Sequence, residues 1–336
     1  MPVPLPPSDA PPTGEQCDSA APEATPLGAD RRRVLLLVNR KAGAGRGARK
    51  VAEAETLLRE SGLDPCRLQT PDELTEAAAE AMAQQTLRAV VAIGGDGTVG
   101  LALNRTPAGT ALAVMPAGTE NLLAKYLEQR ARPRELVDLL TGGVEVRLDA
   151  GEANGRLFAL MISVGFDADV VHRVHRSRRG NITHLAYAKP FFDALRIYKY
   201  PSLRAAWQGP GADAAGGATG RWLFGMNLPR YAQGLPISPE ASGTDGLIDL
   251  CVFKRGYASS AVWYLWNLLR RRHHRLPSVS ITPCREFSVE SDEKVPYQLD
   301  GDPGGFLPVT VRSMPQRLTC IVRPDIAARL GFRLPS

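Results

Sequence analysis

The chain has 336 residues, which is more than one typical hydrophobic core accommodates and suggests two domains. A hydrophobic content of 44% and a charged content of 23% are typical of a globular protein, and no apolar run is long enough to span a membrane. The formal net charge of +6 favours anionic partners, such as nucleotides, nucleic acids or an anionic membrane surface.

The N-terminal residues 1–30 are rich in proline and contain no apolar run, so we expect a disordered tail. Apolar strands and amphipathic helices then alternate. The expected strands are 34–38, 66–70, 89–93 and 111–115, and the expected helices are 46–61, 71–86, 121–127 and 134–141. This alternation predicts an α/β domain in which a parallel sheet has helices on both faces.

From about residue 144 the pattern changes to short strand-like runs separated by turn residues. These runs are 144–150, 156–164, 202–209, 221–228, 247–254, 278–282, 286–291 and 309–312. They predict an antiparallel β-rich domain. Two helical insertions interrupt it, at 169–200 and 257–272, and we expect the Gly- and Ala-rich stretch 209–220 to be a mobile loop or hairpin tip.

The motif Gly94-Gly95-Asp96-Gly97-Thr98 directly follows the apolar strand 89–93. Because glycines carry no side chains and allow a positive φ, several backbone N–H groups can converge there on an anion. An acid in such a cradle requires a divalent cation or water between the negative groups. The motif therefore predicts binding of a nucleotide phosphate with magnesium. The alternative is a tight turn in an α/β domain.

A second glycine motif, Gly118-Thr119-Glu120-Asn121, follows the strand 111–115. It places Thr119 and Asn121 at a helix N-terminus, where N–H groups and a partial positive charge attract phosphate. Plain N-capping by either residue is the alternative. Two glycine-bearing strand ends in one α/β unit favour a ligand site, because ligands of open parallel sheets bind beyond the carboxyl ends of the strands.

Six short motifs occur in order between Arg33 and Arg323. They are Val38–Gly43, Gly94–Thr98, Pro116–Asn121, Ser163–Asp169, Thr244–Leu250 and Leu299–Asp302. In order and approximate spacing the chain resembles the diacylglycerol kinase-like lipid kinases, a family that includes bacterial lipid kinases, sphingosine kinases and ceramide kinase. The resemblance covers nearly the whole chain except its N-terminal tail.

The resemblance implies a two-domain lipid kinase fold. An N-terminal doubly wound nucleotide-binding domain would occupy 31–147, completed by the chain end from about 316 to 336. A C-terminal antiparallel β-sandwich domain with helical insertions would occupy 148–315. The run Leu318–Val322 is a credible strand for the return to the first domain. The implied reaction is transfer of the γ-phosphate of ATP, with Mg²⁺, to a hydroxyl of a lipid such as diacylglycerol or a sphingoid base, in the cleft between the domains.

The sequence context of Asp96 is consistent with three roles: a water-mediated magnesium ligand, a base, or a structural partner of the N–H groups of its own loop. The resemblance favours a catalytic role near the metal. It also implies that a set of residues at the ends of strands in the first domain binds ATP: Asn39, Gly43, Thr70, Gly94, Gly95, Gly97, Thr98, Gly118, Thr119 and Asn121.

Asp302 is the residue that the resemblance implies as general base for the lipid hydroxyl. The family usually has Asp-Gly-Glu at this motif, whereas this chain has Asp300-Gly301-Asp302. Aspartate is one methylene shorter, which withdraws the carboxylate by about 1 Å, and misplacement on that scale costs on the order of 100-fold in rate. A modest shift of the loop would restore the contact, so the substitution weakens the case for high activity without removing it.

Three further acids have both a functional and a structural interpretation. The resemblance implies a structural magnesium or an acidic network near Asp245 and Asp249, and the alternative is an Asp-Gly turn that opens a strand. Asp169 occupies the place where sphingosine-type relatives hold the polar end of their lipid. Its alternative is an acid at a helix N-terminus, favoured by the helix dipole.

The two helical insertions mix aromatic and basic residues. Trp263 and Trp266 precede the arginines 270–272, and arginines between 173 and 179 precede an aromatic stretch. Such segments suit contact with an anionic membrane surface, and the alternative is amphipathic helices with a basic solvent face. We expect no nucleic acid partner, because no recognisable binding module accompanies the arginines.

Five cysteines without a CxxC pair, and no secretory signal, favour reduced thiols and a cytoplasmic protein that associates peripherally with membrane. Two other functions stay open. An NAD kinase would share the Gly94–Thr98 motif and a similar first domain, and a catalytically weak regulator would bind lipid or nucleotide. A homodimer is also left open.

Overall fold

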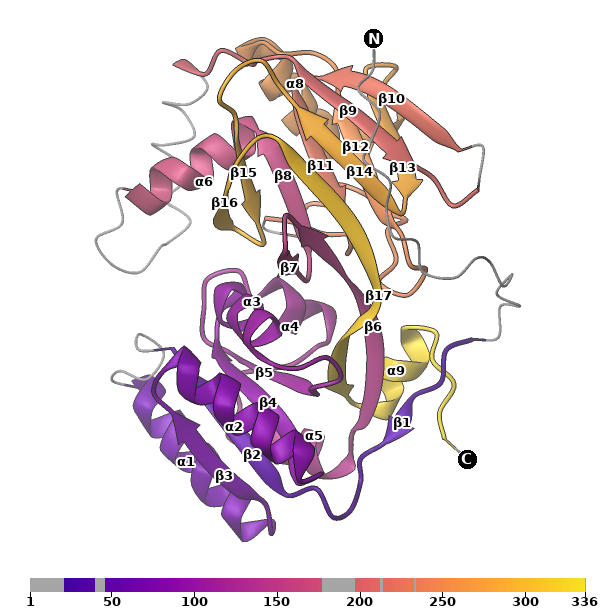
Figure 1. Ribbon diagram of the computed structural model, residues 1–336. Coiled ribbons are helices and arrows are strands. Elements are labelled where there is room, and N and C mark those ends of the chain that lie inside the picture. Colours follow the sequence, from indigo (N-terminus) through magenta and orange to yellow (C-terminus); the bar gives the residue numbers. More distant parts are fainter. Residues whose placement is uncertain (1–20, 40–45, 177–196, 212–213, 233, 336) are drawn as a thin grey trace.

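The computed structural model describes residues 21–39, 46–176, 197–211, 214–232 and 234–335 (Figure 1). Within these residues two β-sheets organise the chain, one of 11 strands and one of six. The larger sheet runs through both halves of the molecule, and the smaller sheet belongs to the second half.

Four parallel strands form the first half, in the order β3-β2-β4-β5. They are β2 (Arg33–Val38), β3 (Asp64–Leu68), β4 (Leu87–Gly94) and β5 (Leu112–Pro116). Since the chain winds outward from β2 to β3 and then in the opposite direction from β4 to β5, the neighbours β2 and β4 flank the switch point of the sheet. The central strand β4 is buried along its whole length, as helices on both faces require.

Helices cover both faces of these parallel strands. One face carries α1 (Arg46–Glu60) and α5 (Pro133–Gly142), and the other carries α2 (Pro71–Ala83), α3 (Asp96–Arg105) and the short α4 (Leu122–Tyr126). Alternate strand residues serve the two cores: Leu36 packs under α1 and α5, and Leu35 packs under α2 and α3. The predicted doubly wound α/β domain is confirmed.

The second half is an antiparallel sandwich. Its smaller sheet has the order β13-β12-β11-β8-β15-β16, and the facing part of the larger sheet has the order β10-β9-β14-β17. The strands are β8 (Met161–Gly165), β9 (Leu203–Gln208), β10 (Ala215–Gly220), β11 (Trp222–Met226), β12 (Ile248–Phe253), β13 (Val279–Cys284), β14 (Glu286–Glu290), β15 (Pro296–Leu299), β16 (Asp302–Phe306) and β17 (Val309–Val322). Phe158, Phe287 and Tyr297 lie in the core between the sheets, so the predicted antiparallel β-domain is confirmed.

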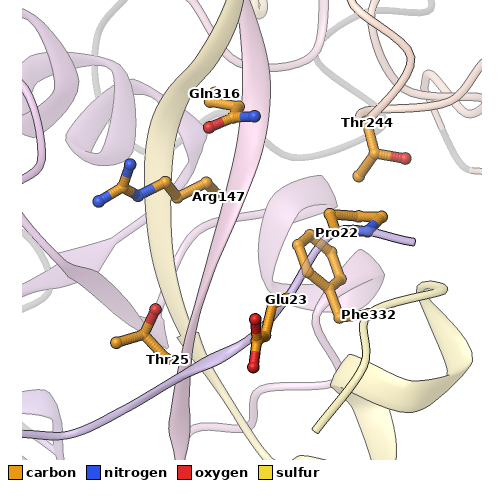
Figure 2. Close-up of a pocket in the computed structure, with 7 residues that line it drawn as sticks. All are labelled: Pro22, Glu23, Thr25, Arg147, Thr244, Gln316 and Phe332. Carbon is orange, nitrogen blue, oxygen red and sulfur yellow. The ribbon is translucent and has the colours of Figure 1, made fainter. Parts of the chain in front are cut away.

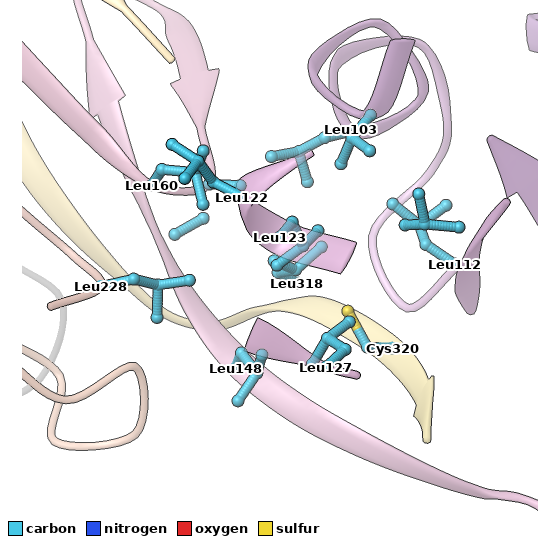
Figure 3. Packing of buried hydrophobic residues seen from close by; sticks show 14 of the residues in the cluster. Leu103, Leu112, Leu122, Leu123, Leu127, Leu148, Leu160, Leu228, Leu318 and Cys320 are labelled. Atoms are coloured by element: carbon cyan, nitrogen blue, oxygen red, sulfur yellow. The ribbon is translucent and has the colours of Figure 1, made fainter. Parts of the chain in front are cut away.

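Two long strands connect the halves. β17 pairs antiparallel with β6 (Val144–Ala153), and Figure 1 shows them side by side along the junction. Near its end β17 returns to the parallel strands, where Cys320 pairs with Leu112 of β5. The predicted strand Leu318–Val322 is the last part of β17. One buried cluster continues across the junction and includes Leu103, Leu112, Leu123, Leu148, Leu160, Leu228, Leu318 and Cys320 (Figure 3).

Residues 22–30 differ from the disordered tail that the sequence predicts. Thr25 and Pro26 form β1 (Thr25–Pro26) against the start of β6, and Ala24 is buried. Backbone hydrogen bonds join Ala24 to Arg333 and Arg333 to Pro22, so the segment is also tied to the chain end. Since backbone hydrogen bonds hold this segment in place, its sequence contains no apolar run that would predict its structure. Residues 1–20 lie outside the described part.

The stretch 209–220 is corrected in part. Residues 215–220 form β10 and pair with β9 along its whole length, so the predicted hairpin tip is only the connection between Gln208 and Ala215. A Cβ on Gly216 would lie 2.5 Å from the ring of Trp207, so glycine leaves room for the indole across the strand. The two insertions contain α6 (Phe166–Arg176) and α8 (Ala258–Leu269). Residues 177–196 of the first insertion lie outside the described residues.

Candidate active site

The carboxyl ends of β2, β4 and β5 meet at one edge of the sheet and bring the first glycine motifs together. Asn39 follows β2, and its Nδ2 donates to Oγ1 of Thr98 over 3.5 Å. A Cβ on Gly94 would lie 2.1 Å from the same Oγ1, and a Cβ on Gly118 would lie 2.6 Å from the α-carbon of Gly95. Only glycine permits these close approaches, so the motifs form one tight backbone surface.

The N-terminus of α3 points to this edge. The helix begins at Asp96, and its N-cap residue Gly95 makes no side-chain capping bond. The first N–H groups of a helix have no partner within it, and the helix dipole places a partial positive charge there. Since no side chain of the N-cap residue competes, this end of α3 is suited to bind an anion.

Asp96 joins α3 to α4. Its Oδ2 accepts a hydrogen bond from the backbone N–H of Leu122 over 3.0 Å, and its Oδ1 accepts one from Leu123 over 3.2 Å. Desolvation raises the pKa of Asp96 in spite of these two bonds. The sequence predicts that the first N–H groups of α4 bind phosphate, but in the structure they donate to Asp96. The side chain of Asn121 forms two hydrogen bonds with the backbone of Gly118.

Thr70 has a structural role at the start of α2. Its Oγ1 accepts from the N–H of Glu73 over 3.2 Å, and the Glu73 carboxylate accepts from the N–H of Gln69 over 2.8 Å. Thr70 is thus the N-cap of α2, and Glu73 holds the residue before the cap. Thr119 lies exposed between Gly118 and Asn121. Gly43 lies outside the described residues, so its expected contact with ATP stays a prediction.

The turn between β15 and β16 is anchored by Asp300. Its carboxylate accepts hydrogen bonds from the N–H groups of Ala159 at 2.7 Å and of Leu160 and Met161 at 2.9 Å each. Desolvation outweighs these bonds and, with the nearby charge of Asp96, raises the pKa of Asp300 to about 6. Asp300 therefore fixes the turn that carries Asp302 to the first half of the molecule.

Asp302 reaches the N-terminus of α3. Its Oδ2 lies 2.9 Å from the position that a Cβ on Gly97 would occupy. His175 of α6 places Nε2 3.4 Å from Oδ1, and the nearest guanidinium nitrogen of Arg156 is 4.0 Å from Oδ2. The side chain is 36% exposed, so its carboxylate is accessible to a substrate. The structure thus brings the last sequence motif onto the first glycine loop.

A polar network behind this turn escapes the sequence analysis. Gln298 of β15 accepts from the N–H of Gly301 over 2.7 Å, and its Nε2 donates to Ser163 at 2.9 Å and to Asp167 at 3.2 Å. Tyr231 donates to the same carboxylate. Desolvation raises the pKa of Asp167. His175 was also missed, because only the tertiary fold brings α6 beside the β15–β16 turn.

Asp169 lies in the first turn of α6 and forms an ion pair with Arg173 one turn later. This contact matches the structural interpretation of an acid near a helix N-terminus. The contact of Asp169 with a lipid head group stays a prediction.

Asp245 and Asp249 belong to a network that includes Asp149, which the sequence analysis missed. Asp149 of β6 accepts from the N–H groups of Gly246 at 2.7 Å and Gln316 at 2.8 Å. Asp245 accepts from the N–H of Leu247, and Asp249 accepts from the hydroxyl of Ser238. Burial raises the pKa of all three acids. Among the described residues no group of three or more His, Cys, Asp or Glu is arranged to hold a metal, so a magnesium here stays a prediction.

A cavity of about 310 Å³ lies elsewhere, beside β1 and β6 (Figure 2). It is lined by Pro22, Glu23, Thr25, Arg147, Thr244, Gln316 and Phe332. None of the residues expected to hold ATP is among them. No helix in the described part of the chain is long and apolar enough to cross a membrane.

Comparison with known families agrees with this geometry. The family model "Diacylglycerol kinase catalytic domain" matches residues 33–153, and the model "YegS C-terminal NAD kinase beta sandwich-like domain" matches residues 160–322. The chain is 29% identical over 245 residues to a diacylglycerol kinase of Bacillus subtilis, covering 70% of this chain and 77% of that protein. It is 23% identical to a diacylglycerol kinase of Staphylococcus saprophyticus, covering 88% and 97%.

Solved structures show the same fold. A Bacillus anthracis crystal structure, named "a putative diacylglycerol kinase", superposes with a TM-score of 0.68 at 19% identity, covering 89% of this chain and 99% of that one. Yeast NADH kinase, crystallised with NADH, superposes with a TM-score of 0.51 at 10% identity, covering 89% and 86%. The two family models together cover nearly all of the described fold, and the chain belongs to the diacylglycerol kinase-like lipid kinase family.

Proposed function

We propose that this kinase transfers the γ-phosphate of ATP to a hydroxyl of a lipid, such as diacylglycerol or a sphingoid base, between the N-terminus of α3 and the β15–β16 turn. One observation carries the proposal: the carboxylate of Asp302 lies beside Gly97. A candidate base from the second half of the molecule therefore meets a candidate phosphate loop from the first half.

The nucleotide binds at the carboxyl ends of β2 and β4, which flank the switch point of the sheet. The backbone from Gly94 to Gly97 and the first N–H groups of α3 face the phosphates. Asn39 and Thr98, which are hydrogen-bonded to each other, form the side of the site next to β2.

Mg²⁺ fits this place by the chemistry of its donors, because Asp302 presents a partly exposed carboxylate beside Gly97 and Asp96 precedes Gly97 in the chain. When bound, the ion neutralises negative charge on the phosphates during transfer. Burial raises the pKa of Asp96 in spite of its hydrogen bonds to Leu122 and Leu123.

Asp302 accepts the proton of the lipid hydroxyl as the hydroxyl oxygen bonds to the γ-phosphorus and the bond to ADP breaks. His175 and Arg156 lie on either side of its carboxylate and orient it. Asp300 and Gln298 act through the backbone of the turn and hold it in position. Positioning of this kind provides much of the acceleration in phosphoryl transfer.

Asp169 binds the polar end of the lipid in this proposal, and Arg173 sets its orientation. Asp245 and Asp249 would hold a second Mg²⁺ through their carboxylate oxygens, and burial raises the pKa of both acids. This second ion has its own test without nucleotide. Mg²⁺ should raise the melting temperature of the wild type, and Asp245→Asn should remove that shift.

Transfer of labelled γ-phosphate from ATP with Mg²⁺ tests the reaction. The acceptors are diacylglycerol, sphingosine, ceramide, phosphatidylglycerol and NAD, with the lipids in mixed micelles. A labelled lipid supports the proposal and names the acceptor. Label on NAD would make the protein an NAD kinase. If no acceptor in the panel becomes labelled, although the protein binds ATP, the result would favour a regulator that binds lipid or nucleotide instead.

A further inference from the structure

The helix α8 is apolar on two opposite faces. Its inner face packs on the smaller sheet, where the ring of Tyr264 lies edge-on to Trp222 and Phe253. The outer face carries Val262, Trp263, Leu265, Trp266 and Leu269, which are 61%, 48%, 36%, 50% and 61% exposed. A surface helix normally presents polar residues on that side, so the packing of the fold does not explain these five.

Tyr257, just before the helix, is 73% exposed and adds a sixth large hydrophobic side chain to these five. We call the six residues the α8 apolar patch. Among the described residues they are six of the nine large hydrophobic side chains that are exposed. Scattered exposed hydrophobic residues are ordinary, but a concentration of this kind marks a surface that contacts another phase or molecule.

A basic cluster follows the patch directly. It consists of Arg270, Arg271, Arg272, His274 and Arg275, all exposed. Residues 250–285 contain seven Lys or Arg and no Asp or Glu, and the four arginines make no ion pair with any acid in the described ranges. The guanidinium of Arg270 lies 4.1 Å from the ring of Trp266, so cation and aromatic face solvent together.

We propose that the α8 apolar patch and the basic cluster dock the kinase on an anionic lipid bilayer. The two tryptophans suit the interface between acyl chains and head groups, and the arginines suit lipid phosphates. The purpose of docking rests on the proposed lipid substrate, since it brings the acceptor half to the membrane that holds the acceptor. A second copy of the chain fits less well, because a two-fold axis through α8 would bring two basic clusters together.

Vesicle sedimentation without ATP tests the docking separately from catalysis. The full chain is mixed with vesicles of phosphatidylcholine alone, or of phosphatidylcholine with phosphatidylglycerol. The first variant pair compares Trp263→Gln/Trp266→Gln with Leu334→Gln, an exposed apolar residue near the chain end. The second compares Arg270→Gln/Arg272→Gln with Arg59→Gln/Arg67→Gln, which makes the same change in net charge on exposed positions of the first half.

Wild type and both controls should sediment with the anionic vesicles only. The tryptophan variant should bind at least about tenfold more weakly, and the Arg270/Arg272 variant about 30-fold more weakly, since one cation near an anionic surface is worth roughly fivefold. All variants should keep the wild-type melting temperature and the wild-type turnover of a short-chain, monomeric diacylglycerol.

Equal binding by the α8 variants and the wild type would overturn the proposal. So would a wild-type dimer that the tryptophan variant converts to monomer, with no vesicle binding by either, because the patch would then be an interface between copies. Vesicle binding that needs α8, in a protein that phosphorylates no lipid, would instead contradict the proposed function and leave the docking surface in place.

Discussion

The carboxylate of Asp302 lies against the α-carbon of Gly97, so that a Cβ on Gly97 would be 2.9 Å from Oδ2. The two residues come from opposite halves of the chain, and Asp302 is held there by a turn that Asp300 anchors to β8 and the residues before it. Their contact joins the loop that we assign to phosphate with the base that we assign to the acceptor.

Gly97→Ala should lower kcat for lipid phosphorylation by about tenfold, because the added methyl group displaces the Asp302 carboxylate by a few tenths of an ångström or more. The fold should persist, since alanine favours a helix more than glycine does. Gly100→Ala is the matched control in the same helix, where a Cβ meets open space. Equal activity of the two variants would show that the contact with Gly97 is not used.

Asp302→Glu tests whether the site is built around the shorter acid. The longer side chain must pass the space beside Gly97 that the aspartate already fills, so we expect no gain in kcat. Asp302→Asn should lose at least about 100-fold, because an amide cannot accept the proton. A glutamate variant faster than wild type would mean that the aspartate is set back from its substrate.

Asp96→Asn should remove most phosphoryl transfer and lower the free energy of unfolding by about 1–3 kcal/mol, because one N–H of α4 loses its acceptor. Kinetic assays and denaturant unfolding check the two effects. Asp72→Asn, at an acid that is 83% exposed, should change neither. Normal turnover by the Asp96 variant would remove this residue from the mechanism.

His175→Asn should lower kcat about tenfold by loosening the Asp302 carboxylate. A positioning role has a second signature: kcat should fall while KM for the lipid stays near the wild-type value. His274→Asn, at an exposed histidine outside the site, should leave kcat and KM unaltered on a short-chain substrate. A wild-type kcat in the His175 variant contradicts the role.

Asp300 predicts a pH dependence of stability. Its pKa is raised to about 6 in the folded chain, against about 3.9 in an unfolded one, so the folded state holds the proton more tightly. The resulting stabilisation is complete below about pH 4 and is lost as the pH rises through 6. Relative to Asp300→Asn, the wild type should lose about 2–3 kcal/mol of unfolding free energy between pH 4 and 7. Parallel curves for the two proteins would show that Asp300 is not desolvated.

Local patterns predicted the parts of the fold that depend on one segment of chain. The apolar run 89–93 and the glycines after it predict both β4 and the start of α3. The apolar residues indicate a buried strand, and the adjacent glycines indicate where its backbone turns. By contrast, β15 and β16 contain prolines and glycines and have no apolar alternation, so pairing of β15 with β8, and of β16 with β15, is what makes them strands. The predicted strand 309–312 extends to Val322 because β6 pairs along it.

The candidate site was predicted where a motif carries its own chemistry and missed where partners come from elsewhere. Asp96, Gly97 and Asp302 stand in recognisable motifs. His175 and Gln298 lie in segments whose sequence offers no such signal, and only packing of α6 and β15 brings them to Asp302. Asp149 is a single polar residue in the sequence of a strand, although its carboxylate accepts from the backbone N–H groups of Gly246 and Gln316.

The most direct test of the central claim is a side-by-side measurement of γ-phosphate transfer from ATP and Mg²⁺ to diacylglycerol in mixed micelles, with wild type and Asp302→Asn matched for ATP binding. We predict labelled lipid from the wild type and a loss of at least about 100-fold in the variant at unchanged ATP affinity. Equal rates from the two proteins, or no labelled lipid from a wild type that binds ATP, would contradict the assignment of the contact between Asp302 and Gly97 as the place of transfer.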